Sequence, residues 1–426
     1  MGLTLYEHQR QALEDTADKN RVAYYHDMGM GKTFTGAEKM HQLGARVNLV
    51  ICQKSKIEDW IEHFKSNYKS DIDALYDLTN KKAFDEFIQT AEVYDYLTVV
   101  GVINYELAFR RPELLKLHNF TLTLDESSLI QNEQAKRTKF IMKLKFENLI
   151  LLSGTPTGGK YEKLWSQLKM LGYNITKKSF YIQYVNYHYD DRQGFPLMII
   201  DGYKNVDRLK RKMREYGCSF LKTEEVLTLP EQIFTPVKIK KNSLYGKFMK
   251  DCIVTVDGVE LVGDTTLTKL LYARMLCGAY SADKLEAFKE LAESTSDRLI
   301  VFYNFNAELE ALKCVCNALE RPYSVVNGES KDLYAYENEI ASITLIQYQA
   351  GAMGLNLQKA NKIIYFTPPL SSELYEQSKK RTHRLGQNNT CFYYYLTCKG
   401  SIEEKIYSTL AMRRDYTNAL FEESEE

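Results

Sequence analysis

Short apolar runs alternate with longer amphipathic segments along most of the 426-residue chain. The run Val47–Cys52 has the length of a buried strand, and the segment Ser55–Phe64 that follows it reads as a helix. Strands that alternate with helices predict a parallel sheet covered on both faces, whose ligands bind at the carboxyl ends of the strands. In the first part of the chain we expect further strands at Tyr96–Val102, Phe120–Leu124 and Leu149–Leu152, and helices at Leu3–Ala17, Thr33–Leu43 and Asn104–Leu117.

The second half of the chain repeats this pattern. We therefore expect an α/β fold of two lobes, residues 1–172 and 236–426, each a mostly parallel sheet with helices on both faces. Residues 173–235 are expected to form a short helical insertion and connector. The strands expected in the second half are Leu299–Tyr303, Ser324–Asn327, Ile343–Gln347, Ile363–Phe366 and Phe392–Leu396, and the last helix is Ile402–Leu420.

The expected insertion is rich in lysine, arginine and tyrosine. Its helix Val206–Tyr216 is strongly basic. A basic helix is usually a solvated surface, but this one is basic enough to keep nucleic-acid binding as a second interpretation. Pro230 ends the segment, and the join between the lobes is expected near it.

A candidate phosphate loop, His26–Thr33 (HDMGMGKT), lies between a short apolar run and a predicted helix. Gly29 and Gly31 allow the backbone to curl, so that successive N–H groups point at an anion. Lys32 can reach the β- and γ-phosphates of a nucleotide, and the Thr33 hydroxyl can bind Mg²⁺. The strict pattern has a glycine at the first position of this stretch, where this chain has His26. The alternative interpretation is an ordinary helix start. The strand–turn–helix context favours phosphate binding.

Tyr6 and Gln9, which precede the loop in the sequence, are candidates for contact with the base of the nucleotide. A glutamine amide both donates and accepts hydrogen bonds, which matches the edge of adenine. A solvated position on a helix is the alternative for Gln9.

The dipeptide Asp-Glu occurs twice, at residues 85–86 and 125–126. The first pair lies in a polar helical segment and is best explained as solvated surface. Asp125 and Glu126 instead end an apolar strand, where two carboxylates need a charged partner. Magnesium with a triphosphate is such a partner, Asp125 holding the metal through water and Glu126 orienting the water that attacks the γ-phosphate.

Composition narrows the class of protein. Lys+Arg and Asp+Glu both number 56, so overall charge gives no argument for nucleic acid, and any such site must be local. The eight cysteines form no Cys-x-x-Cys pair, which favours a reduced intracellular protein. The N-terminus does not resemble a signal peptide, and no apolar run approaches the length of a membrane span. We expect a cytoplasmic protein, or one of the host-cell cytoplasm if a phage encodes it.

The second half carries the arginine-rich sequence QSKKRTHRLGQ, residues 377–387, after the glycine-spaced turn AGAMGLNL, residues 350–357. The cations could form a solvated surface. However, a phosphate-loop lobe joined to a similar lobe with an arginine-rich motif is the arrangement of motor ATPases. In such enzymes arginines, here Arg381 and Arg384, reach the γ-phosphate.

Taken in order, these motifs resemble those of superfamily-two helicases and, among them, the Swi/Snf-type DNA translocases. The resemblance extends from Leu5 to about Leu410, and the arginine-rich motif is its most specific part. The motifs that carry it are LYEHQ, DMGMGKT, VICQKSKIEDW, NYE, DESS with Gln131 and Asn132, LLSGTPTGG with LWSQLKML, VFYNF, AGAMGLNL and QSKKRTHRLGQ.

The resemblance implies two RecA-like lobes and a role for each matching residue. Catalysis is expected from Lys32, Asp125, Glu126, Arg381 and Arg384, with Mg²⁺ held by Thr33 and Asp125. The expected contacts to ATP are Tyr6, Gln9, Asp27, Met28, Gly29, Met30, Gly31, Lys32, Thr33, Gly354 and Asn356. Coupling is expected from Ser153, Gly154, Thr155 and Gln377. The expected contacts to nucleic acid are Lys54, Lys56, Asn104, Tyr105, Asn304 and Gln349.

The sequence departs from the family pattern at a few positions. Gln53 stands where proline is usual, Ser128 replaces a common histidine, and Gln131 stands where lysine is usual. The segment Pro368–Glu373 replaces a tryptophan-asparagine-proline element. Lys32, Glu126 and Arg384 are all present, so an active ATPase is expected.

The resemblance implies a DNA-stimulated ATPase that uses ATP and Mg²⁺ to translocate on double-stranded DNA, mainly through phosphate contacts. We expect a minimal motor of bacterial or phage type, monomeric, with a nuclease or a recombination or repair protein as a possible partner. The alternatives are a helicase that separates strands of DNA or RNA, and a nucleotide-switched binding module for such a partner.

Overall fold

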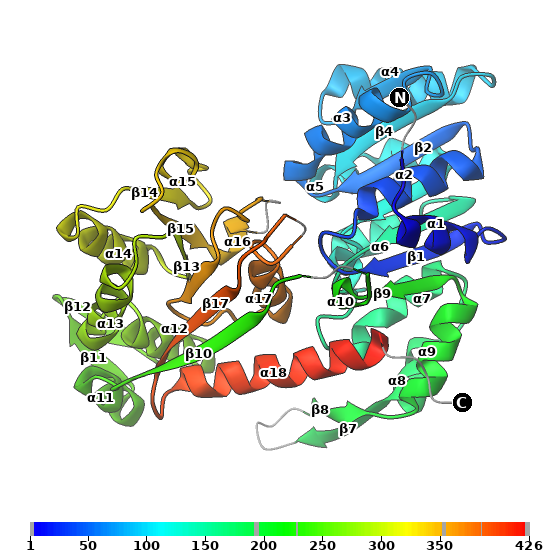
Figure 1. The fold of residues 1–426 in the computed structure, drawn as a ribbon. Coiled ribbons are helices and arrows are strands. Elements are labelled where there is room, and N and C mark those ends of the chain that lie inside the picture. The colour runs from blue at the N-terminus through cyan, green and yellow to red at the C-terminus, as the bar shows by residue number, and fades with distance from the viewer. Residues whose placement is uncertain (1–3, 191–195, 227–228, 352–354, 385, 422–426) are drawn as a thin grey trace. The chain divides into compact units, whose positions relative to one another are not determined.

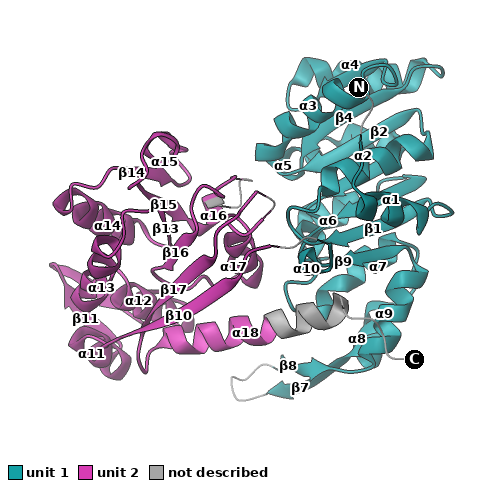
Figure 2. Cartoon of the chain, viewed as in Figure 1, with its two compact units in different colours: residues 1–226, 415–426 teal, residues 227–414 magenta. Residues whose placement is uncertain are grey.

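The computed structural model describes residues 4–190, 196–226, 229–351, 355–384 and 386–421. The chain forms two compact units, shown in different colours in Figure 2. The first unit consists of Met1–Val226 with Asp415–Glu426, and the second consists of Leu227–Arg414.

The first unit is built on a seven-stranded sheet in which every paired strand is parallel to its neighbour. The strand order is β3-β4-β2-β5-β6-β1-β9, so most neighbours are connected by a crossover. Such a sheet brings the carboxyl ends of its strands to one edge, where ligands bind. The strands are β1 (Arg21–His26), β2 (Val47–Cys52), β3 (Ala74–Asp77), β4 (Val99–Asn104), β5 (Thr121–Asp125), β6 (Asn148–Leu152) and β9 (Cys218–Leu221).

Helices cover both faces of this sheet (Figure 1). Alternate residues of β1 enter different apolar clusters, Ala23 and Tyr25 one and Val22 and Tyr24 the other, as expected for a strand buried on both faces. The helices are α1 (Glu7–Glu14), α2 (Lys32–Leu43), α3 (Ile57–Asn67), α4 (Lys81–Val93), α5 (Tyr105–Ala108), α6 (Lys136–Ile141), α7 (Trp165–Met170), α8 (Lys177–Tyr184), α9 (Val206–Glu215) and α10 (Thr223–Val226), with short 3₁₀ turns η1 (Lys54–Lys56), η2 (Pro112–Lys116), η3 (Ser127–Ile130) and η4 (Tyr161–Leu164).

The segment that follows α7 groups with the first unit. It holds α8, the antiparallel hairpin β7 (Val185–Asp190) and β8 (Leu197–Tyr203), α9 and β9. Strand β9, which the sequence pattern did not reveal, pairs in parallel with β1, with Ala23 opposite Cys218. The domain boundaries expected at residues 172 and 235 stay a prediction.

The second unit repeats the architecture with a six-stranded parallel sheet, in the order β10-β17-β16-β13-β15-β14. Its central strand β13 is buried along its whole length and alternates between two apolar clusters, with Ile300 and Phe302 in one and Val301 and Tyr303 in the other. The strands are β10 (Gln232–Ile239), β13 (Leu299–Tyr303), β14 (Tyr323–Val326), β15 (Ile343–Gln347), β16 (Lys362–Tyr365) and β17 (Cys391–Cys398).

A smaller helical element with a hairpin precedes β13, and helices alternate with the strands after it. The longest helix is the last one, α18 (Ile402–Phe421). No described helix combines the length and the apolar character that crossing a membrane requires. The elements are α11 (Ser243–Asp251), β11 (Ile253–Val256), β12 (Val259–Val262), α12 (Thr266–Cys277), α13 (Ala282–Glu293), α14 (Asn306–Ala318), α15 (Tyr334–Asn338), α16 (Tyr348–Gly351) and α17 (Ser372–Lys379).

The predicted fold class is confirmed: both units are α/β, with mostly parallel sheets. Two helix predictions were wrong in extent. The first helix, expected at Leu3–Ala17, is the shorter α1, Glu7–Glu14. The segment expected as a single helix, Asn104–Leu117, is the short helix α5 followed by the 3₁₀ turn η2. Pro112 accounts for the break, because the residue before a proline is disfavoured in the α conformation.

Candidate nucleotide site and nucleic-acid interface

The candidate phosphate loop connects β1 to α2 in the first unit. Gly29 and Gly31 have positive φ values of 86° and 69°, which residues other than glycine rarely adopt. A Cβ atom at Gly31 would also come within 2.3 Å of the Gln9 amide nitrogen. The positive φ therefore favours glycine at Gly31, a side chain there would also displace the Gln9 amide, and the loop backbone can approach an anion closely.

Lys32 is the first residue of α2, and its ammonium group donates to the main-chain oxygens of His26 (3.1 Å) and Asp27 (3.2 Å). These contacts fold the lysine back over its own loop. His26 is fully buried beside it. Burial, with a smaller contribution from the charge of Lys32, lowers the pKa of His26 to about 3, so its ring is neutral at neutral pH. Thr33 follows Lys32 in the first turn of α2.

Asp27 connects the phosphate loop to β9 and α10, which come late in the main segment of the first unit. Its carboxylate accepts hydrogen bonds from the main-chain N–H and the hydroxyl of Thr223, each at 3.1 Å. Its own N–H donates to the Leu221 oxygen at 2.9 Å. The sequence motif indicated a nucleotide contact for Asp27 but did not reveal this link to β9 and α10.

The base-contact candidates differ in exposure. Gln9 is buried, with its Oε1 accepting the Tyr6 N–H at 2.9 Å and its Nε2 donating to the oxygens of Met30 (3.3 Å) and Gly31 (3.2 Å). The amide thus supports the phosphate loop in this structure. Tyr6 is 59% exposed and stacks on His8, so its ring offers a face to an adenine. Contact of either residue with adenine stays a prediction.

Asp125 is the last residue of β5, and its carboxylate orientation is defined by two hydrogen bonds. Oδ1 accepts the Glu126 N–H at 3.1 Å, and Oδ2 accepts the indole N–H of Trp60 at 2.9 Å. Each carboxylate oxygen has two acceptor sites, so the group retains capacity for a hydrated cation. Glu126 has a left-handed backbone, φ 53° and ψ 58°, which turns the chain sharply at the strand end.

The coupling candidates of the first unit, Ser153, Gly154 and Thr155, lie beside both motifs. A Cβ atom at Gly154 would lie 3.1 Å from Met28 Cγ and 3.4 Å from Lys32 Nζ, so this backbone approaches the phosphate loop closely. The hydroxyl of Ser153 donates to Glu126 at 3.5 Å and accepts the Thr155 N–H at 3.2 Å. The structure thus brings together the phosphate loop, the acidic pair and the coupling candidates. Gly154 leaves space beside the Lys32 ammonium, and the Asp125 carboxylate lies at the end of β5, the strand next to β6. These features fit a magnesium–triphosphate group.

Two glutamines connect the acidic strand end to the coupling segment. Gln131 and Gln167 both donate to the Pro156 oxygen, at 3.2 Å and 2.9 Å. The Gln167 oxygen in turn accepts from Ser127 at 2.8 Å and from Tyr25 at 3.0 Å. These bonds connect the two motifs although Ser128 replaces the usual histidine. Sequence reasoning missed the part played by Gln167.

The nucleic-acid candidates of the first unit fall into two groups. Lys54 is exposed and Lys56 is half-buried, both in η1 ahead of α3, and Lys56 pairs with Asp59 at 2.6 Å. Asn104 is buried and Tyr105 has no exposed surface. The Tyr105 hydroxyl donates to the Asp125 main-chain oxygen at 2.9 Å, so this side chain supports the acidic strand end and offers nothing to DNA in this structure.

Most of the candidate residues in the second unit form hydrogen bonds with other residues of that unit. Asn304 donates to Thr367 Oγ1 at 2.8 Å, while Gln349 is exposed. Arg381 is buried, and Arg384 is half-buried and donates to Asn356. The Gln377 amide donates to Glu373 at 3.4 Å. Gly354 lies outside the described residues.

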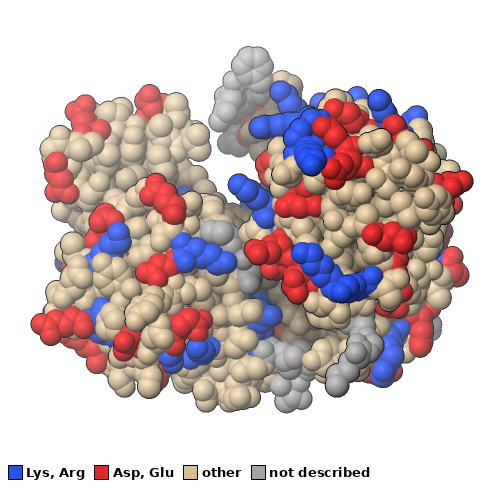
Figure 3. Space-filling view, turned by 90° about the horizontal axis from the view of Figure 1, so that it is seen from above, with Lys and Arg blue, Asp and Glu red and all other residues tan. Residues whose placement is uncertain are grey.

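Surface charge is mixed over the face shown in Figure 3, where Lys and Arg are interspersed with Asp and Glu. This agrees with equal numbers of acidic and basic residues in the sequence, 56 of each. Attraction of nucleic acid therefore has to come from local groups of lysines and arginines.

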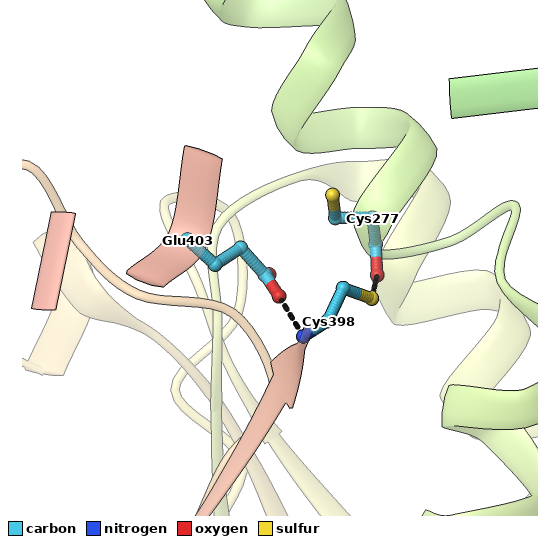
Figure 4. A group of neighbouring side chains, drawn as sticks. All are labelled: Cys277, Cys398 and Glu403. Atoms are coloured by element: carbon cyan, nitrogen blue, oxygen red, sulfur yellow. Dashed lines mark hydrogen bonds between the residues drawn. The ribbon is translucent and has the colours of Figure 1, made fainter. Parts of the chain in front are cut away.

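Within the described residues, one group of side chains meets the distance criterion for a metal site, Cys277, Cys398 and Glu403, whose ligand atoms lie within 4.8 Å of one another (Figure 4). All three are buried. Lys284 already bonds both Glu403 oxygens, at 2.7 Å and 2.8 Å, inside the core. The ammonium supplies the positive charge that a metal ion would bring, so we interpret the group as a buried ion pair beside two thiols.

The sequence of this chain matches two families of known proteins. Residues 15–276 match the SNF2-related domain family, and residues 283–386 match the helicase conserved C-terminal domain family. A SWI/SNF-related matrix-associated actin-dependent regulator of chromatin subfamily A member 1 of Mus musculus is 23% identical over 89% of this chain and 39% of its own length. The putative ATP-dependent helicase/translocase YwqA of Bacillus subtilis is 24% identical over 89% of this chain and 44% of its own length.

The chain thus spans about two fifths of the length of these curated relatives. Among solved structures, a Sulfolobus solfataricus SWI2/SNF2 ATPase core in complex with dsDNA aligns over 100% of this chain and 94% of that chain, with 18% identity and a TM-score of 0.46. The first family match alone, residues 15–276, covers more than half of the 426 residues. The chain therefore belongs to the SNF2-related family of helicase-like ATPases.

Proposed function

We propose that this chain hydrolyses ATP and uses the reaction to move along double-stranded DNA. The observation that carries the proposal is the meeting of three motifs at the carboxyl ends of β1, β5 and β6. Gly154 lies against Lys32, and Ser153 hydrogen-bonds Glu126. Each motif could occur by itself for other reasons, but their convergence fits phosphoryl transfer.

In the proposed reaction, the backbone N–H groups around Gly29 and Gly31 bind the phosphates, and Lys32 compensates their charge. Lys32 would exchange its contacts with the loop oxygens for phosphate oxygens. Thr33 and Asp125 would hold Mg²⁺, which supplies positive charge to the phosphate oxygens. Glu126 would orient the attacking water and accept its proton.

The second unit would complete the site with arginines. The sequence contains one Gly-Lys-Thr phosphate loop, at residues 31–33, so the arginine-rich motif has no nucleotide of its own to serve. We propose that Arg381 and Arg384 contact ATP bound by the first unit and stabilise the charge that develops during transfer.

Double-stranded DNA is the proposed track, and the contacts are proposed to be mainly to phosphates. The names of relatives support this choice, since one is a helicase/translocase and another a regulator of chromatin. Lys54, Lys56 and Gln349 are the candidates with exposed or half-buried side chains. The protein is proposed to act as a monomer within the cell.

The decisive experiment measures ATPase rate against duplex DNA, single-stranded DNA and RNA in separate titrations, with Lys32→Ala as the inactive control. Stimulation by duplex DNA, together with displacement of a third strand from a triplex, supports translocation. Strand separation without a duplex track would identify a helicase instead. A rate that no nucleic acid changes would favour a nucleotide-switched binding module.

Charge reversal tests the phosphate contacts. Because each phosphate contact releases counterions, Lys54→Glu and Lys56→Glu should each weaken binding similarly across sequences and lower the salt slope by roughly one unit. Lys82→Glu is the matched control, a lysine on α4 with 88% of its side chain exposed. Loss of binding to particular sequences alone would contradict backbone recognition.

A further inference from the structure

Trp60 is a buried tryptophan that hydrogen-bonds a carboxylate. Its indole N–H donates to the Asp125 carboxylate at 2.9 Å, while the ring itself is 1% exposed. The chain has two tryptophans, and the other, Trp165, donates its indole N–H to the main-chain oxygen of Ile175 at 2.9 Å. The two bonds have the same length and donor, and they differ in the acceptor, a carboxylate in one case and a neutral amide oxygen in the other.

A second buried aromatic residue holds the backbone of the same aspartate. The Tyr105 hydroxyl donates to the Asp125 main-chain oxygen at 2.9 Å and lies 3.5 Å from that of Glu126. Tyr105 has no exposed surface, so this hydrogen bond is shielded from water. Both the side chain and the main chain of Asp125 are thus held by donors from other elements.

These donors lie close in the chain to residues expected to contact DNA. Trp60 lies in the first turn of α3, four residues after Lys56. Tyr105 begins α5, directly after the strand β4. Both are rigid rings with one polar atom, so a displacement of either element changes the position or orientation of Asp125. Lys56 is the N-cap residue of α3, so the indole hydrogen bond connects the helix that follows the surface lysines to the acidic strand end.

We propose that Trp60 and Tyr105 are positioning residues that orient Asp125 for the magnesium–nucleotide complex and make this orientation depend on DNA bound at η1 and α3. The part that concerns DNA rests on the proposed function. The part that concerns Asp125 does not, because it rests on the two hydrogen bonds. Groups that orient a metal-binding carboxylate commonly change metal affinity by about tenfold or more when removed.

Trp60→Phe tests the proposal, because phenylalanine keeps an aromatic ring but has no N–H donor. The measurement is the Mg²⁺ concentration that half-saturates binding of a fluorescent ADP analogue, without DNA. We expect it to rise about tenfold in Trp60→Phe, with nucleotide binding in the absence of Mg²⁺ unchanged. Trp165→Phe, the matched control, should match the wild type. Equal Mg²⁺ dependence in Trp60→Phe and Trp165→Phe overturns the positioning role.

The two variants also provide single-tryptophan reporters. In Trp165→Phe the emission of Trp60 should change when Mg²⁺ is added to the ADP complex, whereas the emission of Trp165 in Trp60→Phe should not. Tyr105→Phe covers the case in which Trp60→Phe does not fold, and it should raise the Mg²⁺ requirement in the same direction. A silent Trp60 signal with an unchanged Tyr105→Phe overturns the proposal.

Duplex DNA added to the same titrations tests the linkage. DNA should shift the Mg²⁺ requirement of the wild type and of Trp165→Phe, and this shift should be smaller in Trp60→Phe. A wild-type Mg²⁺ requirement that duplex DNA does not shift overturns the linkage, while the ATPase rate measured with the same DNA decides the proposed function separately and the DNA-free titrations still decide the role of Trp60. A full DNA response in Trp60→Phe overturns the linkage alone.

Discussion

Glu126 adopts a left-handed backbone, φ 53°, directly after the buried strand β5. For a residue with a side chain this conformation costs about 1 kcal/mol or more, and such strain is concentrated at functional sites. Here it turns the carboxylate of Glu126 away from the line of the strand, toward Ser153 of β6's carboxyl end. The carboxylates of Asp125 and Glu126 thereby take different hydrogen-bond partners although the residues are adjacent, which fits the different roles proposed for them.

Substitution of each charged residue should therefore have a different effect. Glu126→Gln should bind ATP but slow turnover by roughly a hundredfold or more, because water orientation and proton acceptance are lost. Lys32→Ala should weaken ATP binding as well, because the phosphates lose their ammonium partner. Equilibrium binding and single-turnover hydrolysis separate the two outcomes. Near-normal turnover by Glu126→Gln would contradict its assignment.

At the scale of elements, the phosphate loop is connected to β9 and α10 through Asp27. Thr223 is 3% exposed, so its hydroxyl bond to the Asp27 carboxylate is sheltered from water. Hydrogen bonds to charged groups contribute about 1.5–3 kcal/mol. The loop conformation should thus depend on an element at the end of the first unit's main segment.

Thr223→Val tests this dependence, because valine keeps the shape of threonine and removes the hydroxyl. We expect faster amide exchange at residues 27–31 and nucleotide binding weaker by several-fold, since the loop loses one restraint. Thr223→Ser retains the hydroxyl and is the control. Identical exchange rates in the valine and serine variants would show that this bond does not hold the loop.

The buried carboxylate of Glu308, on α14, makes the stability of the second unit depend on pH. Burial raises the pKa of Glu308 from 4.5 to about 7, although Oε2 accepts hydrogen bonds from Asn304 (2.8 Å), Phe305 (3.2 Å) and Thr367 (3.0 Å). The folded protein therefore holds this proton more tightly than the unfolded chain. The stability from this group is complete below about pH 4.5 and is lost as pH rises to about 7.

Glu308→Gln should remove this dependence. A shift of this size corresponds to about 3 kcal/mol, so the variant should lose much less stability than the wild type between about pH 5 and about pH 8. Denaturant unfolding at both pH values, followed by a signal from the second unit, measures the difference. The same pH dependence in both proteins would mean that Glu308 is ionised in the folded state.

At the scale of the whole molecule, the proposed reaction requires both units, because the phosphate loop belongs to one and the arginine-rich motif to the other. Arg384→Ala should leave folding and most ATP binding intact and slow DNA-stimulated hydrolysis roughly a thousandfold. Arg384→Lys should restore little, because an ammonium lacks the planar fork of a guanidinium. Single-turnover hydrolysis with saturating duplex DNA is the measurement. A wild-type rate for Arg384→Ala would contradict a shared site.

From the sequence alone we predicted the two-sheet α/β fold, which the structure confirms, and the central residues of the nucleotide site, which stay a prediction. Apolar strands of limited length, such as Val47–Cys52, could be located because burial on both faces demands a continuous apolar run. The phosphate loop and the pair Asp125–Glu126 could be located because their chemistry needs residues that are close in sequence. Strand β9 could not be located, because three of its four residues are only partly buried.

The residues that hold the candidate site in place became visible only in the folded chain. The bond from Trp60 to Asp125 joins residues 65 positions apart, and the bond from Thr223 to Asp27 joins residues 196 apart. The fold also placed Tyr105, expected at a DNA surface, in the core beneath the acidic pair. Local patterns describe which face of an element is buried, but the partner of a buried polar atom depends on which distant strand lies beside it, and the chain satisfies that demand only when it folds.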